Sequence, residues 1–292
     1  MELLRTLRSW MRSTRPDTSR AREAPNGRIG RVRVGLVTII DEEFTAAQKV
    51  FDLHEHLGRG YFVRKNGKAP WDVALMQATD RSNIPVAGDV KNFMEDLRPQ
   101  VLVLVGIAGG MCDGQIGRDG IGPGDVVLAN QVSYVEFLKL SHGQPPRMRS
   151  YAIDHPSVPL RRNVSIPISK QFKLSERVQF APPAQRETKI HIGEIVSGEK
   201  VMGDVSSHVQ KGLLDPFDKA LAVDMESIGM ARAVCDGRDS LWYHPRYTVI
   251  RGISDLVADQ ENNAQRDDWK RFAAHAAAVV AQEFVRMLPE DP

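Results

Sequence analysis

Short runs of apolar residues recur along the chain, separated by glycine-rich turns or by helical patterns. Val32 to Ile40, Val101 to Val105 and Thr248 to Ile250 are rich in β-branched side chains. Runs of this composition are typical of strands that are buried on both faces, as in a parallel sheet. Because the runs alternate with helical patterns, we predict an α/β fold, namely a single domain with a mixed, largely parallel central sheet flanked by helices.

The intervals between these runs complete the predicted order of elements. Apolar residues recur at helical spacing from Phe44 to Leu57, from Pro85 to Leu97 and from Asp267 to Leu288. Further apolar runs predict strands at Trp71–Ala78, Val126–Val132 and Lys189–Val196, and residues Leu221–Ser227 predict a short strand that meets a helix. No tandem repeat interrupts this alternation.

The segment from 141 to 188 departs from the alternating pattern. Its seven prolines, among them Pro159 and Pro167, predict that it contains no long helix. A stretch of this length inside a compact domain is usually a lid, a binding insertion or an interface arm. We therefore predict that residues 31–292 form the α/β domain, with an irregular insertion at about 141–188.

The first 33 residues differ in charge from the rest of the chain. They hold nine arginines against three acidic residues, a charge of +6, so the remainder carries +2 minus 6, or −4. Residues 1–30 are predicted to be a basic extension and linker. Apolar residues at helical spacing in residues 1–12 would allow contact with a protein or an anionic membrane. A solvated, partly ordered extension is the simpler interpretation, and an organelle transit peptide is a further alternative.

Composition limits the partners and the compartment. The formal net charge of +2 does not indicate a nucleic-acid partner. Cys112 and Cys235 are too few for a disulfide framework or a zinc site, so we expect reduced thiols, a cytoplasmic protein, and neither a metal nor a cofactor. No apolar run approaches the ~18 residues of a membrane span.

Polar residues and glycines follow several of the predicted strands. Glu43 follows the first strand, Gly106 to Gly110 the third, Met225-Glu226 a later one, and Ser254-Asp255 the last. Ligands of open α/β sheets bind beyond the carboxyl ends of the strands. Simpler interpretations remain open, because acids favour helix N-termini, Ser and Asp cap helices, and a glycine cluster can be a turn.

Six short motifs follow one another along the chain. They are Val34-Gly-Leu-Val with Asp-Glu-Glu43, Gly106-Ile-Ala-Gly-Gly110, Gly124-Asp-Val-Val, Ile195-Val-Ser-Gly198, Val223-Asp-Met-Glu226 and Arg251-Gly-Ile-Ser-Asp255. In this order they resemble the nucleoside phosphorylase/nucleosidase superfamily, and most of all its branch of 5′-methylthioadenosine/S-adenosylhomocysteine nucleosidases. The resemblance spans roughly residues 32 to 288.

The resemblance implies an enzyme that cleaves the N-glycosidic bond of a purine, most simply adenine, nucleoside or nucleotide. It implies that Asp255 protonates N7 of the departing base, that Ser254 orients this acid, and that Glu43 positions the attacking water. It assigns the substrate-binding residues as Glu226 and Met225 at the ribose, Val201 and Met202 at the base, and Ile107, Ala108 and Gly109 in the glycine-rich segment. It also implies a homo-oligomer, a dimer or higher.

Departures from the superfamily pattern favour hydrolysis. Leu104 stands where the phosphorylases tend to carry a phosphate-binding arginine, and Thr38-Ile39-Ile40 replaces a glycine-containing turn. An uncompensated phosphate there would be costly. A phosphorolytic purine nucleoside phosphorylase and a non-catalytic nucleoside- or nucleotide-binding module are the alternatives.

The 5′ substituent of the substrate is left open by the sequence. Arginine pairs bidentately with phosphate, so a nucleotide substrate, and with it a nucleotide-degrading effector role as found in this superfamily, is a second hypothesis. Its candidate residues are Arg147, Arg149, Arg161 and Arg162. The alternative is that these are solvated loop charges or contacts to a neighbouring subunit.

Overall fold

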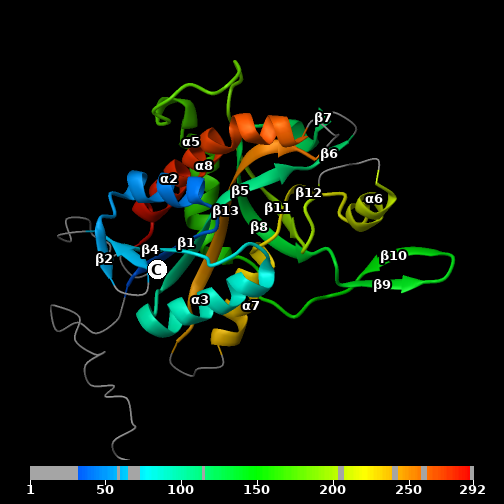
Figure 1. Cartoon of the computed structure of the whole chain (residues 1–292), viewed down its shortest axis with the longest axis horizontal. Coiled ribbons are helices and arrows are strands. Elements are labelled where there is room, and N and C mark those ends of the chain that lie inside the picture. Colours follow the sequence, from blue (N-terminus) through cyan, green and yellow to red (C-terminus); the bar gives the residue numbers. More distant parts are fainter. Residues whose placement is uncertain are drawn as a thin grey trace, which may run out of the picture. The chain divides into compact units, whose positions relative to one another are not determined.

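A mixed sheet forms the centre of the protein in a computed structural model of the chain (Figure 1). The structure describes residues 32–57, 60–64, 73–113, 116–202, 207–238, 243–257 and 262–289. The predictions made for residues 1–30 lie outside the described residues. None of the helices in the described ranges has the length and apolar character needed to span a membrane.

Nine strands in the described part of the chain pair in the order β12-β11-β8-β13-β5-β1-β4-β3-β2. Central pairs such as β1–β5 and β5–β13 are parallel, while β8–β13 and the β2–β3–β4 edge are antiparallel. The strands are β1 (Val34–Thr38), β2 (Glu55–Leu57), β3 (Tyr61–Val63), β4 (Val73–Gln77), β5 (Val101–Gly110), β8 (Val126–Tyr134), β11 (Ile190–Ser197), β12 (Ala220–Asp224) and β13 (Arg246–Leu256). The predicted mixed, largely parallel sheet is thus confirmed.

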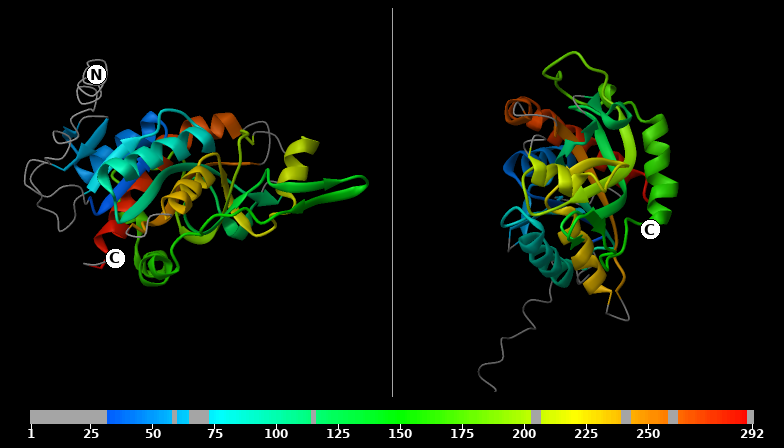
Figure 2. Two further views of the ribbon diagram at one scale, coloured as in Figure 1. Left: turned by 90° about the horizontal axis from the view of Figure 1, so that it is seen from below. Right: turned by 90° about the vertical axis from the view of Figure 1, so that its right-hand side faces the viewer.

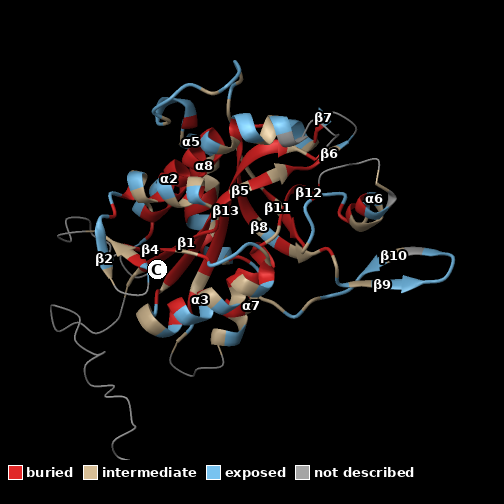
Figure 3. Cartoon of the chain, viewed as in Figure 1, coloured by how far each residue is buried: buried red, intermediate tan, exposed pale blue. Residues whose placement is uncertain are grey.

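Helices cover both faces of this sheet (Figures 1 and 2). On one face, Val101, Val103 and Val105 of β5 pack with α2 (Asp41–Phe51) and α8 (Asn262–Arg286). On the other face, Leu102 and Leu104 pack with α3 (Asn83–Leu97) and α7 (Ser227–Gly237). Side chains alternate between the faces of a strand, so an entirely apolar run serves two cores at once. Figure 3 shows the sheet buried between the helices.

The two central strands extend further than their apolar runs predict. β5 continues through the glycine cluster to Gly110, and β13 continues past Ile253 to Leu256. They pair in parallel as far as Leu256 opposite Gly110, with an irregularity in register between Ile253 and Asp255. The glycine cluster is therefore no turn and Ser254-Asp255 caps no helix, because pairing with a neighbouring strand keeps both segments extended.

The helix after β1 is shorter than the spacing predicts. It ends at Phe51, because Asp52 adopts a left-handed backbone with φ of 55°. Leu57, which was included in the predicted helix, lies in β2 at the sheet edge. The apolar spacing of the helix therefore continued by coincidence past its end at Phe51 and into β2.

The segment from 141 to 188 is more regular than its prolines predict. It begins within an exposed hairpin of β9 (Leu138–Ser141) and β10 (Gln144–Met148), seen at the right of Figure 3. Helical structure then runs from Val158 to Gln171 as α4 (Val158–Leu160), a π-helical turn and α5 (Ile166–Gln171). The prediction of no long helix was wrong, because Pro159 lies in a first turn, where its missing N–H costs nothing, and Pro167 follows the π-turn, where the α-helical hydrogen bonds are already interrupted.

The remaining elements are small. A second hairpin consists of β6 (Cys112–Asp113) and β7 (Ile116–Gly117), and α6 (His208–Leu214) follows β11. Three-residue 3₁₀ turns lie at Arg118–Gly120 and Leu174–Glu176.

Candidate active site

A cavity of about 230 Å³ lies at the carboxyl ends of β1, β5, β12 and β13. This is the edge at which ligands bind in open α/β sheets. All ten residues to which the resemblance gave a catalytic or substrate-binding role line it, namely Glu43, Ile107, Ala108, Gly109, Val201, Met202, Met225, Glu226, Ser254 and Asp255. Segments more than 200 residues apart in the sequence thus meet in one place, since Glu43 and Asp255 both line this cavity.

Glu43 is held rigidly by backbone amides. Its Oε2 accepts hydrogen bonds from the amides of Ile39 (2.7 Å) and Ile40 (3.2 Å), and its Oε1 accepts one from Ile107 (2.8 Å). The residue lies in the first turn of α2, so its position suits the helix dipole as well as the cavity. A side chain at Gly106 would collide with both Glu43 and Arg251, so glycine is required where β5 passes this carboxylate.

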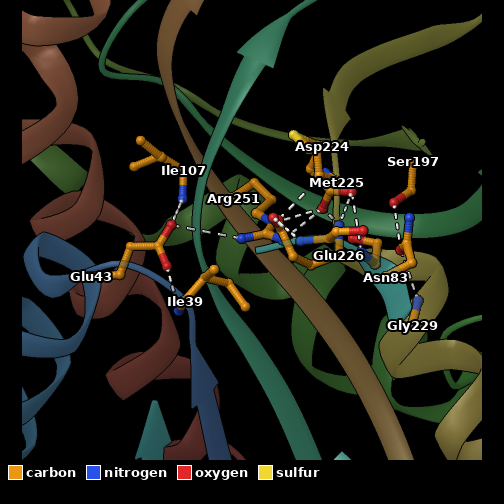
Figure 4. Close-up of polar contacts among 12 residues, drawn as sticks. Ile39, Glu43, Asn83, Ile107, Ser197, Asp224, Met225, Glu226, Gly229 and Arg251 are labelled. Atoms are coloured by element: carbon orange, nitrogen blue, oxygen red, sulfur yellow. Dashed lines mark hydrogen bonds and ion pairs between the residues drawn. The ribbon is translucent and has the colours of Figure 1, made fainter. Parts of the chain in front are cut away.

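Arg251 is completely buried behind the cavity and is surrounded by acids (Figure 4). Its Nε donates to Oδ2 of Asp224 at 2.8 Å and its Nη2 to Oε2 of Glu226 at 3.0 Å. Its Nη1 lies 3.8 Å from Oε1 of Glu43, beyond hydrogen-bond range, and has no hydrogen-bond partner among the described residues. The positive charge of Arg251 thus lies among the carboxylates of Glu43, Asp224 and Glu226 and compensates their buried negative charge.

Asp224 connects this cluster to helix α7. Its Oδ1 accepts from the amides of Glu226 (3.3 Å) and Ser227 (3.2 Å), and its Oδ2 accepts from the hydroxyl of Ser227. The amides at the start of a helix lack partners within the helix, so an acceptor at this point fixes the helix. Asp224 therefore connects the start of α7 to Arg251, and it also fixes the backbone of Glu226, which lies between them.

Ser254 and Asp255 form a second polar pair in the cavity wall. The Ser254 hydroxyl donates to Oδ1 of Asp255 at 2.5 Å and both residues are buried. Oδ2 of Asp255 accepts no hydrogen bond from another described residue. The pair is thus oriented so that one carboxyl oxygen is fixed by the hydroxyl and the other is available to a ligand.

Comparison with known proteins agrees with this architecture. A sequence profile described as the phosphorylase superfamily matches residues 89–289, well over half of the chain. The chain belongs to the phosphorylase superfamily. The membership predicted from six motifs is confirmed. No curated protein sequence matches the chain.

Solved structures share the phosphorylase-superfamily fold. The 5′-methylthioadenosine/S-adenosylhomocysteine nucleosidase of Neisseria meningitidis, in complex with methylthio-immucillin-A, has a TM-score of 0.64 at 17% identity and covers 88% of this chain and 100% of its own. That of Colwellia psychrerythraea, in complex with adenine, scores 0.65 at 19% identity, with 88% and 96% covered. Futalosine hydrolase of Helicobacter pylori scores 0.64 at 18% identity, with 88% and 99% covered. At these identities the likeness shows the fold.

Burial changes the acidity of the three carboxyls in this phosphorylase-superfamily cavity. It raises the pKa of Glu43, against the opposing effects of Arg251 and the backbone amides. It raises the pKa of Glu226 to about 7, since Asp224 and Glu43 add to burial and partly offset Arg251. It also raises the pKa of Asp255, although the Ser254 hydrogen bond and the charge of Arg266 act in the opposite direction.

Two residues of the cluster, Asp224 and Arg251, were quoted in the superfamily motifs but received no role from the sequence. A signal was present, because a charged residue inside the apolar run of β13 must be paired if it is buried. Its partner was not predictable, since β12 and β13 do not pair with each other and are brought together by pairing with opposite edges of β5.

A third residue without a predicted role, Asn83, supports the cavity from the side of α3. It is buried, and its side chain bonds to the carbonyl of Gly198 (3.0 Å), the hydroxyl of Ser197 (3.1 Å) and the amide of Gly229 (2.8 Å). The preceding amide, that of Ser82, is 3.4 Å from Oε1 of Glu226. Asn83 thus ties the start of α3 to β11 and α7 beside the cavity.

The arginines proposed from the sequence for a phosphate are not at the cavity. Arg147, Arg149, Arg161 and Arg162 are absent from its lining, because the hairpin and the helical segment that carry them extend elsewhere. The basic side chains that line it are Arg81, Lys200, Arg266 and Lys270. That expectation about individual residues was therefore wrong.

Proposed function

We propose that the protein hydrolyses the N-glycosidic bond of a purine nucleoside or nucleotide and releases the free base. The observation that carries this proposal is the convergence of Glu43, Glu226 and Asp255 on one cavity. Cleavage of this bond builds positive charge on the ribose ring and negative charge on the departing purine. It therefore requires an acid at the base, and carboxylates near the sugar.

Asp255 is the proposed general acid. Its raised pKa lets it hold a proton nearer neutrality than an ordinary aspartate, whose pKa is ~3.9. Because Ser254 donates to Oδ1, the proton is favoured on Oδ2, from which it can pass to N7 of the purine. Val201 and Met202 line the same cavity and supply an apolar wall for the base.

Glu226 is the proposed ribose ligand. Arg251 occupies its Oε2, while its Oε1 has only the long 3.4 Å contact with the Ser82 amide. Oε1 can therefore accept hydrogen bonds from the 2′- and 3′-hydroxyls. Met225 lines the cavity next to it and offers an apolar surface beneath the sugar.

Glu43 and Arg251 are proposed to hold the attacking water. Oε1 of Glu43 and Nη1 of Arg251 lie 3.8 Å apart, too far for a direct hydrogen bond but close enough for one water to contact both. The carboxylate would accept a proton from that water while the guanidinium donates to its oxygen. Attack of the water at C1′ then balances the reaction, giving ribose and a free purine.

The charges around the cavity favour water over phosphate as the nucleophile. Arg251 is already committed to Asp224 and Glu226, and Glu43 lies on the same side. Leu104, at the position expected for a phosphate-binding arginine, is fully buried in the apolar core. A phosphate ion at C1′ would therefore meet Glu43 and Glu226, whose charges already share the single cation Arg251 with Asp224, at a substantial electrostatic cost.

Product analysis tests this proposal. Adenosine, methylthioadenosine and AMP are incubated with the protein, with and without inorganic phosphate, and adenine is measured by chromatography. We expect adenine and free ribose or its 5′ derivative without added phosphate. Strict phosphate dependence with ribose 1-phosphate as product would identify a phosphorylase instead. No base release from any purine substrate would identify a binding module and refute the proposed hydrolysis.

A further inference from the structure

Two of the four basic side chains that line the cavity are not neutralised by neighbours. Lys200 pairs with Glu136 at 2.6 Å, and Lys270 pairs with Glu42 at 3.2 Å and with Asp267 at 3.4 Å. Arg81 and Arg266, in contrast, form no ion pair with any other residue that the structure describes. The cavity thus presents two guanidinium groups that are available to an anion.

Arg266 is fixed near the proposed general acid. It lies in α8, and the preceding Gln265 accepts a hydrogen bond from the amide of Leu256 at 2.9 Å. This bond attaches the beginning of α8 to the end of β13, directly after Asp255. The charge of Arg266 is close enough to Asp255 to oppose the effect of burial on its pKa, yet no hydrogen bond joins the two side chains.

Arg81 lies in the turn that leads into α3, the helix on the other face of the sheet from α8. It directly precedes Ser82, whose amide contacts Glu226 and whose hydroxyl donates to Glu199. Asn83 fixes the same turn through Gly198 and Glu199. The backbone at Arg81 is therefore well anchored, while its side chain is exposed at the mouth of the cavity.

We propose that Arg81 and Arg266 bind a phosphate group of the substrate, so that the preferred substrates are purine nucleotides and not nucleosides. This inference rests on the function proposed above, because it takes the base and ribose to occupy the inner part of the cavity. Guanidinium groups pair with phosphate in a bidentate manner and remain charged at all relevant pH values.

The size of the cavity is compatible with this arrangement. Its volume of about 230 Å³ is below the roughly 300–1,000 Å³ of most small-molecule sites. A substrate that places its base and sugar inside must leave further substituents at the mouth, where Arg81 is exposed. Phosphates there keep partial access to water, which lowers the cost of binding a charged group.

A bound phosphate would also act on the proposed chemistry. The charge of Arg266 lowers the pKa of Asp255, which works against a carboxyl that must carry a proton. A phosphate next to Arg266 neutralises that charge and so favours the protonated acid. The substrate group that provides affinity would therefore also prepare the general acid, and nucleosides would lack both effects.

Substrate preference in matched variants tests the inference. The ratio of kcat/KM for AMP and ATP to that for adenosine is measured for the wild type, Arg81→Gln, Arg266→Gln and the double variant. Arg271→Gln is the control, since Arg271 is an exposed arginine of α8 that does not line the cavity. We expect a ratio of at least about 10 in the wild type, a roughly tenfold fall in each single variant, a larger fall in the double variant and no change in the control.

Each other outcome has a definite meaning. Adenosine or methylthioadenosine turned over as well as AMP and ATP by the wild type would overturn the phosphate site and leave the proposed hydrolysis intact. An equal fall in kcat/KM for nucleoside and nucleotide in Arg266→Gln would overturn the role of Arg266 in binding phosphate, and would show that it acts only through its charge on Asp255. If no substrate releases base, calorimetry with AMP and adenosine still decides the matter, because the phosphate site predicts tighter AMP binding that the double variant loses.

Discussion

Nε of Arg251 lies 2.8 Å from Oδ2 of Asp224, and this buried ion pair joins two strands that are not neighbours in the sheet. Asp224 ends β12 and Arg251 lies within β13. The same guanidinium reaches Glu226 and faces Glu43, so the geometry of the candidate active site depends on a single cation.

Replacement of Arg251 by methionine should destabilise the protein strongly. It leaves Asp224 and Glu226 buried beside Glu43 without a counter-charge, and breaking a buried pair in this way typically costs about 3–5 kcal/mol. Urea denaturation measures the change. Arg232→Met, which removes an exposed pair with Asp236, is the control and should cost below about 1 kcal/mol. A loss at Arg251 as small as that of the control would contradict the role given to this cation.

Alanine at Gly106 should disturb both Glu43 and Arg251. The added methyl group would overlap the two side chains, which are fixed by other hydrogen bonds and cannot move freely. We expect a loss of about 1–3 kcal/mol in the free energy of unfolding, as for an overpacked core. Gly88→Ala, in an open position of α3, should instead stabilise by about 0.5–1 kcal/mol. Equal behaviour of the two variants in thermal denaturation would show that space at Gly106 is not limiting.

Asp255→Asn should lower purine release by at least about 10²-fold while the fold is retained. The amide keeps the shape of the side chain but cannot deliver a proton to N7. Ser254→Ala should have a smaller effect of the same kind, because the carboxyl remains but loses its 2.5 Å hydrogen bond. Steady-state release of adenine, with circular dichroism as a check on folding, measures both; an Asp255→Asn variant with wild-type turnover would remove this residue from the mechanism.

Glu43→Gln should slow the attack of water and spare ligand binding. The carboxamide can still accept from the Ile107 amide, but it cannot take a proton from the nucleophile. We expect a fall in kcat of at least about 10²-fold with a dissociation constant for substrate within a few-fold of the wild type. Single-turnover kinetics together with calorimetry separate the two effects. A full hydrolytic rate in this variant would leave the water step to another residue.

The pH dependence of stability should report on Glu226. Its pKa rises from 4.5 in the unfolded chain to about 7 in the folded protein, so the folded state binds the proton more tightly. The associated stability is present below pH 4.5 and is lost as the pH rises to about 7, by at most about 3 kcal/mol. Denaturation of the wild type and of Glu226→Gln between pH 5 and 8 should therefore diverge, with the wild type losing stability relative to the variant. Parallel curves would show that the acidity of Glu226 is unaltered by folding.

The extent of the strands was only partly predictable from the sequence. The apolar runs Val101 to Val105 and Thr248 to Ile250 were recognisable because burial on both faces demands apolar residues at every position. Their extensions through Gly110 and Leu256 were not, since glycines and a Ser-Asp pair have no intrinsic preference for strands and are held there by pairing with each other. The helix in residues 158–171 was missed for a similar reason, because tolerance of proline depends on its place in the turn.

The sequence by itself determined which acids could serve the cavity, because Glu43, Glu226 and Asp255 each follow or end a strand and the carboxyl ends of these strands lie at one edge of the sheet. Only the tertiary structure decided how their charges are balanced. Arg251 meets Asp224 and Glu226 although β12 and β13 do not pair with each other. Arg81 reaches the cavity from the turn before α3, and Arg266 reaches it from α8 on the other face of the sheet. Local composition fixes burial, but Coulomb interactions act through space and have no counterpart in residue spacing along the chain.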